Sequence, residues 1–113
     1  SFYESYQQTV FFHPDTLTIP GVTDSYEVYV INYLSTRNYT MIVTVSDIDT
    51  NVVVRLEGST DGTTFAPLLS ETITENGSFA YNSTGFPVKF IRARFLQEVG
   101  GNNARVKFQL SAN

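Results

Sequence analysis

The chain has 113 residues, of which 42% are hydrophobic, and a formal net charge of −4. This length suits one domain with a single two-layer core, and the apolar content excludes global disorder. The absence of Cys excludes disulfides and thiolate metal sites within these residues, and the absence of an apolar run of about 18 residues excludes a membrane-spanning helix.

The first eight residues are rich in Tyr and Ser and follow no regular period. They also lack the basic and apolar regions of an export signal, so we expect none. We predict that residues 1–8 form an arm that contacts a neighbouring molecule through Phe2, Tyr3 and Tyr6, or else a loosely held chain end. The folded domain is then expected to comprise residues 9–113.

Two short extended runs follow the arm, at residues 9–13 and 16–19, and each is stopped at a proline. Residues 26–34 form a longer run that is apolar on both faces. Both faces of such a strand are buried, one by the core of its own domain and the other by a second surface. We therefore expect its second face, formed by Tyr29, Ile31 and Tyr33, to contact another protein.

The middle of the chain continues as strands separated by turn residues. Residues 39–46 alternate between apolar and polar side chains with a period of two, and their β-branched residues favour a strand over a helix. Further extended runs occupy residues 52–57, 65–73 and 78–82. The pair Asp61-Gly62 predicts a turn, and Asn76-Gly77 predicts a two-residue hairpin.

The last two strands, residues 86–95 and 104–110, repeat the same alternation. In each strand the apolar side chains point to one face and the basic side chains to the other. A Gly-Gly-Asn-Asn sequence separates the two strands and predicts a hairpin between them. The hairpin would present a pair of basic strands with Arg92, Arg94, Arg105 and Lys107.

Charge is distributed unevenly along the chain. Residues 1–88 hold ten of the eleven acidic residues, whereas residues 89–113 hold five basic residues against Glu98 alone. Such polarity indicates a docking face for an acidic protein surface. The alternative is that Glu27, Glu57 or another acid on a neighbouring strand pairs with these cations internally. The overall negative charge argues against nucleic-acid binding.

Periodicity also predicts the fold class. No segment places apolar residues at helical spacing over three turns. Short strands recur at regular spacing with turn residues between them. We therefore predict an all-β chain that forms a single antiparallel β-sandwich of jelly-roll type, with about eight strands.

Residues capable of catalysis or metal binding are few. The chain has a single His, His13, and no Cys, so the usual nucleophile and base combinations are lacking and we predict that the protein is not an enzyme. Asp47, Asp49 and Asn51 place oxygen atoms at alternate positions of one loop, and Asp61 lies in the following turn, which would suit calcium. These residues are also ordinary turn residues, and no spaced Glu completes a calcium-binding loop. We predict no metal and no other cofactor.

Two segments resemble known groups of proteins. Residues 58–65 (GSTDGTTF) followed by residues 88–95 (VKFIRARF) resemble a pattern of discoidin-like, galactose-binding-like jelly rolls. The same pattern resembles small β-sandwich virion proteins of tailed bacteriophages, including capsid decoration and accessory head proteins. The second resemblance extends to length, the lack of Cys and a composition rich in Tyr, Phe and Thr.

The resemblance to phage proteins implies a function. We expect a non-enzymatic virion structural protein, such as a phage capsid decoration or accessory protein, that binds the capsid or another virion protein and forms a homo-oligomer. Neither nucleic acid nor membrane is an expected partner. The alternative is a carbohydrate-binding module, in which Tyr or Phe rings and loop Asp or Asn side chains would hold a glycan. The expected protein interface comprises Phe2, Tyr3, Tyr6, Tyr29, Ile31, Tyr33, Arg92, Arg94, Arg105 and Lys107.

Overall fold

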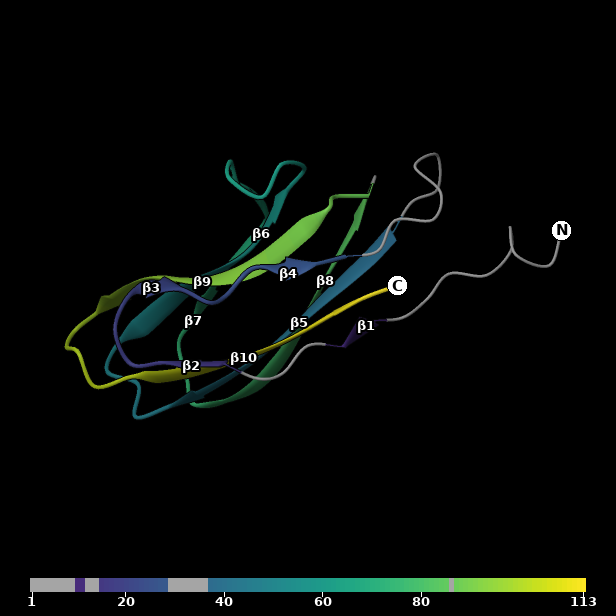
Figure 1. Cartoon of the computed structure of the whole chain (residues 1–113). Helices are drawn as coiled ribbons and strands as arrows, with labels where there is room; N and C mark the ends of the chain where they lie inside the picture. Colours follow the sequence, from purple (N-terminus) through teal and green to yellow (C-terminus); the bar gives the residue numbers. More distant parts are fainter. Residues whose placement is uncertain (1–9, 12–14, 29–36, 86) are drawn as a thin grey trace, which may run out of the picture.

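A computed structural model describes residues 10–11, 15–28, 37–85 and 87–113. Within these ranges the chain forms ten β-strands and no helix (Figure 1). The strands are β1 (Val10–Phe11), β2 (Asp15–Leu17), β3 (Gly21–Val22), β4 (Tyr26–Glu27), β5 (Arg37–Ser46), β6 (Asn51–Ser59), β7 (Ala66–Ile73), β8 (Gly77–Gly85), β9 (Phe90–Val99) and β10 (Arg105–Ala112). The described part of the chain contains no helix of the length and hydropathy needed to cross a membrane.

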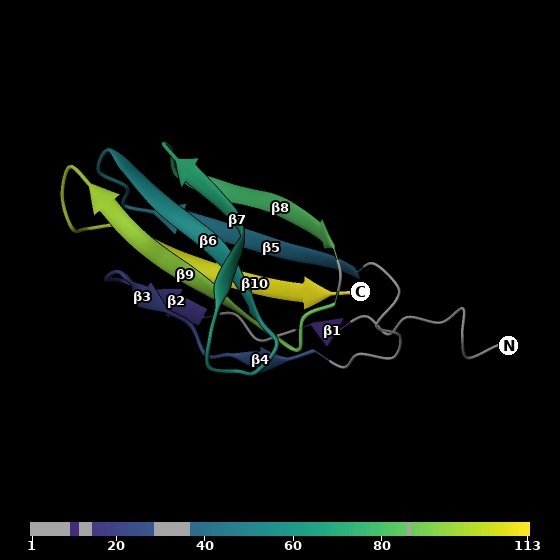
Figure 2. The same ribbon diagram turned by 90° about the horizontal axis from the view of Figure 1, so that it is seen from above.

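The described strands form two antiparallel sheets that pack face to face (Figure 2). In the first, which we call sheet A, the order is β1-β10-β5-β8, and β2 also pairs with β10. In the second, sheet B, the order is β3-β9-β6-β7, and β4 also pairs with β9. Among the described strands from β4 onward, consecutive strands lie in different sheets, except that β6 and β7 lie in the same one. This is the connectivity of a jelly roll, so the predicted fold is confirmed.

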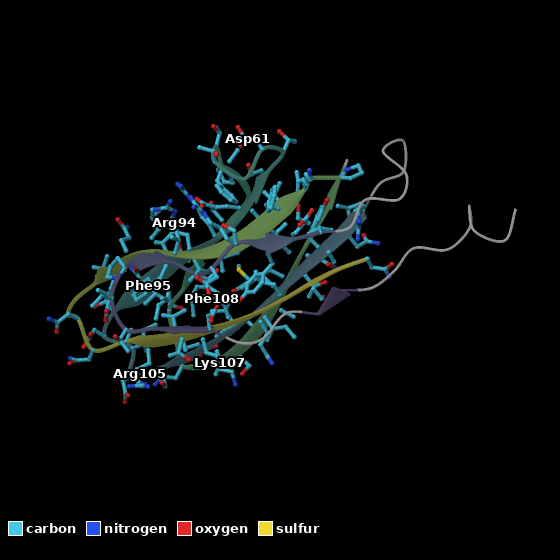
Figure 3. The ribbon with its side chains drawn as sticks, viewed as in Figure 1. Asp61, Arg94, Phe95, Arg105, Lys107 and Phe108 are labelled. Carbon is cyan, nitrogen blue, oxygen red and sulfur yellow. The ribbon has the colours of Figure 1, made fainter. Side chains whose placement is uncertain are left out.

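The hydrophobic core lies between the two sheets and follows the predicted alternation. In β5 every second side chain is buried, from Tyr39 through Met41 and Val43 to Val45. The central strands β6, β9 and β10 contribute their own inward rows to the same cluster. Phe95 from sheet B and Phe108 from sheet A lie between the layers (Figure 3). The inward faces of β9 and β10 are therefore directed toward each other.

The predicted hairpin between the last two strands is wrong. β9 belongs to sheet B and β10 to sheet A, and the Gly100-Gly101 segment carries the chain from one layer to the other. Gly100 has a positive φ of 90°, which favours glycine. A Cβ atom on Gly101 would lie 2.5 Å from Cγ of Asp49, so a side chain here would displace the Asp49 carboxylate. Alternation identifies the buried face of a strand but not the sheet that contains it.

The predicted hairpin at Asn76-Gly77 is wrong for the same reason. The Asn76-Gly77 turn connects β7 of sheet B with β8 of sheet A. Oδ1 of Asn76 accepts a hydrogen bond from the backbone N–H of Ile48 at 3.0 Å. The turn at Asp61-Gly62, by contrast, joins β6 and β7, which pair with each other. Gly62 has a φ of 81°, as predicted for this turn.

Candidate protein interface

The ten predicted interface residues fall into three groups. Six of them, Phe2, Tyr3, Tyr6, Tyr29, Ile31 and Tyr33, lie outside the described residues. Arg92 and Arg94 lie on β9, and Arg105 and Lys107 lie on β10. Because the inward faces of these two strands meet in the core, the two pairs of cations point to opposite outer faces of the sandwich, and Figure 3 shows this for Arg94, Arg105 and Lys107. The prediction of one continuous basic face is therefore wrong.

The two cations on sheet B share one carboxylate. β6 lies beside β9 in a register that places Glu57 opposite Arg92. Nε of Arg92 donates to Oε1 of Glu57 at 2.8 Å, and Nε of Arg94 donates to Oε2 at 2.8 Å. Charge-assisted hydrogen bonds of this kind are about twice as strong as neutral ones. The alternative prediction, that Glu57 pairs internally with these cations, is confirmed.

The surroundings of Glu57 show that this cluster is structural. Glu57 is only 3% exposed, and a buried carboxylate is costly unless it is paired and hydrogen-bonded. The ring of Phe65, which follows the turn after β6, lies 3.8 Å from the guanidinium carbon of Arg92 and covers it. Sequence reasoning missed this contact, since the turn and the strand pairing together determine which cation the ring meets.

The two cations on sheet A have different surroundings from those on sheet B. Arg105 and Lys107 are both exposed, and their cross-strand neighbours are uncharged. Arg105 lies opposite Ser46, and Lys107 lies between Thr16 of β2 and Thr44 of β5. These five side chains line a shallow hollow of about 160 Å³. No carboxylate among the described residues forms an ion pair with either cation.

On the outer face of sheet A, most side chains of β5 and β8 are short and polar. Hydroxyl and amide groups of β5 and β8 form cross-strand hydrogen bonds in three rows. The pairs are Thr44 with Ser78 at 2.9 Å, Thr40 with Asn82 at 3.0 Å, and Thr84 with Asn38 at 2.7 Å. Ile42, which is 37% exposed, lies among them beside Ala80. These residues form an uncharged surface beside the two cations of β10, which also carries Gln109 opposite Ile42.

The acid of β2 does not reach this surface. Asp15 lies opposite Phe108, whose side chain is in the core, and Oδ2 of Asp15 accepts a hydrogen bond from the hydroxyl of Tyr26 at 2.6 Å. Burial and this hydrogen bond together raise the pKa of Tyr26 to about 12. Asp15 is thus engaged with sheet B and leaves Lys107 without an acidic neighbour on its strand pair.

The acidic residues that we considered for calcium, where we predict no metal, do not all lie together. Asp47 and Asp49 precede β6, whereas Asp61 follows it, so the nine residues of β6, about 30 Å of extended chain, separate them. Oδ2 of Asp49 accepts a hydrogen bond from the backbone N–H of Asn103 at 3.0 Å. Across the described ranges, no group of three His, Cys, Asp or Glu side chains is placed to hold a metal ion.

Asp49 instead forms part of the loop structure at one end of the sandwich. Glu98 hydrogen-bonds to Asp49, which lowers the pKa of Asp49 and raises the pKa of Glu98. Beside them is an open hollow of about 620 Å³. Its lining residues are Thr18, Asp47, Ile48, Asp49, Asn102, Asn103 and Arg105.

Asp61 has a similar local role at the opposite end. Its Oδ1 atom accepts hydrogen bonds from the backbone N–H groups of Thr63 and Thr64, both at 2.8 Å, and from the hydroxyl of Ser59 at 2.9 Å. These bonds lower the pKa of Asp61 to about 2, because they favour the ionised form. Asp61 thus holds the turn that leads to Phe65.

Comparison with known proteins gives little further information. No family model matches the chain, and no curated protein matches it. Among solved structures, a similar chain comes from work on Bacillus endospore appendages, described as a family of disulfide-linked pili. It shares 13% sequence identity, the match covers 94% of this chain and 88% of that chain, and the TM-score is 0.42. A likeness at this level does not assign a function.

Proposed function

We propose that this chain is a non-enzymatic structural protein of a virus particle, of the capsid decoration or accessory type, that docks on an acidic protein surface through the outer face of sheet A. The observation that carries the proposal is the exposed pair of Arg105 and Lys107. These cations lie beside the uncharged outer faces of β5 and β8 and form no ion pair with the described residues.

Electrostatics supports an acidic protein as the partner. Two exposed cations on one side of a strand, neither of them in an ion pair with a described carboxylate, attract carboxylates and orient an approaching surface. Their neighbours Thr16, Thr44 and Ser46 offer hydroxyl groups for the same carboxylates. Nucleic acid is disfavoured because the whole chain carries a net charge of −4 and would repel phosphates.

The first experiment tests whether the chain is part of a virus particle. Virus particles released by the host that encodes this chain are purified by density-gradient centrifugation and their proteins are quantified. We expect the chain in a fixed ratio to the major capsid protein. Its absence from purified particles would contradict the assignment to a virion.

The second experiment tests the docking surface. Arg105→Gln/Lys107→Gln is compared with the control Arg55→Gln/Lys89→Gln, which removes the same charge but on β6 and just before β9. Binding to particles that lack the chain, and to immobilised polyglutamate, is measured at several salt concentrations. We expect the first variant to bind about tenfold more weakly, or about 0.7 kcal/mol per cation, and the control to bind like the original chain. Equal losses in both variants would show that only net charge matters.

The carbohydrate-binding alternative is tested by a glycan array. No aromatic side chain lines the hollow beside Arg105, among the described residues, so the stacking contact that a sugar usually finds is not provided there. We therefore expect a silent array. Binding to a defined glycan together with no binding to particles would favour the alternative.

A further inference from the structure

β8 forms one border of sheet A. It pairs with β5 along its whole length on one side, and none of the described strands pairs with it on the other (Figure 2). The nine residues of β8, GSFAYNSTG, include no charged residue and no proline. Fully extended, such a strand offers about 30 Å of unpaired backbone N–H and C=O groups.

The other described edges differ from β8. β7, the edge of sheet B on the same flank, contains Pro67 and Glu71, and its pairing with β6 shifts register between Leu56 and Glu57. The strands at the opposite edges, β1 to β4, are only two or three residues long. Proline, charge, irregular pairing and short length all protect an edge from adding another strand. β8 has none of these features.

The side chains of β8 fit close approach of another strand. Those that point outward from the sandwich, Ser78, Ala80, Asn82 and Thr84, are exposed and short. On the inward side Phe79 and Tyr81 are only half-buried, although they pack against the core. Burial and the nearby charge of Glu71 raise the pKa of Tyr81. A strand added at this edge would cover both rings.

Self-pairing is favoured by the composition of β8. Two identical strands that pair about a two-fold axis bring like residues close together, so a charged residue near the axis would meet its own charge. β8 carries no charge. With the axis at Tyr81, Ser78 would lie opposite Thr84 and Ala80 opposite Asn82 of the second copy. Pairs of hydroxyl and amide groups already hydrogen-bond between β5 and β8.

We propose that two copies of this chain associate through β8, which pairs antiparallel with itself and joins the two copies of sheet A into one continuous sheet. The contact is closed, because each β8 edge is used up by its partner. It provides about eight backbone hydrogen bonds and covers Phe79 and Tyr81. This inference does not depend on the docking of sheet A on another protein.

The test introduces a charge at the edge. Ala80→Lys places a Lys on the outward face of β8, and the control Thr72→Lys places one on the outward face of β7 on the same flank. Sedimentation equilibrium from low to high micromolar concentration is expected to show a dimer for the original chain and for Thr72→Lys, and a monomer for Ala80→Lys. Circular dichroism and thermal melting establish that both variants are folded.

Amide hydrogen exchange provides a second readout of the same contact. In the dimer we expect the β8 amides directed away from β5 to exchange slowly. In Ala80→Lys, or on dilution to monomer, these amides should exchange quickly while those of β5 stay protected. The proposal is overturned by a monomeric original chain, by a dimer of Ala80→Lys, by fast exchange of these amides in the dimer, or by assemblies that keep growing with concentration.

Discussion

The two basic pairs of this protein have nearly the same sequence pattern but different surroundings. Arg92 and Arg94 converge on Glu57, which is buried, whereas Arg105 and Lys107 face serine and threonine hydroxyls and remain exposed. The difference arises from the adjacent strand, because β6 offers a carboxylate at the matching position and β5 does not. The role of a charged strand is therefore decided by its cross-strand neighbour.

The largest expected effect comes from removing the shared carboxylate. Glu57→Gln keeps the shape of the side chain but leaves two guanidinium groups without their anion. We expect the free energy of unfolding to fall by about 3 kcal/mol, measured by urea denaturation. Arg105→Gln/Lys107→Gln should change it by no more than about 0.5 kcal/mol, since exposed cations without partners contribute little. Similar losses in the two variants would remove the distinction between the regions.

A smaller effect is expected at the ring that covers Arg92. Phe65→Ala removes the cation–π contact and should lower the free energy of unfolding by about 1 kcal/mol. Phe65→Tyr keeps an aromatic face and serves as the control, with stability close to that of the original chain. If Phe65→Ala were as stable as Phe65→Tyr, the ring would play no part in fixing the cluster on sheet B.

The smallest effect concerns the turn that presents Phe65. The pKa of Asp61 is lowered to about 2 in the folded chain, below its usual value near 4, so its contribution to stability is present above about pH 4. That contribution is lost as the pH falls toward 2, when the carboxylate takes up a proton. Melting temperatures of the original chain and of Asp61→Asn should therefore converge between about pH 4 and pH 2. A constant difference across this range would contradict the role of the ionised carboxylate.

The two-residue alternation of side chains correctly predicted the fold class and the buried faces of the main strands. The inward rows of β5, β9 and β10 are the rows that alternation indicated, because one side of each strand has to be buried. The same reasoning placed β9 and β10 in one hairpin. Two strands whose apolar faces meet across a core show the same pattern as two strands side by side, so the pattern does not distinguish them.

The candidate site was less accessible to sequence reasoning. Glu57 lies opposite Arg92 because of the register between β6 and β9. That register includes an irregularity between Val53 and Val54. The position of Phe65 depends on the turn held by Asp61. Asp49 precedes β6 and Asp61 follows it, so the oxygen cluster that we considered and did not predict cannot include both. In each case a long-range arrangement decided the outcome.

The cations on β10 and the border strand β8 belong to the same sheet, and this has a consequence for attachment. In sheet A, β10 is separated from β8 by β5 alone. If β8 pairs with itself, the two β10 strands lie five strand spacings apart, or about 24 Å, with both sets of cations on the same side. The dimer would then bind the partner surface at two sites. Once the first site is bound, the second binds at a high effective concentration.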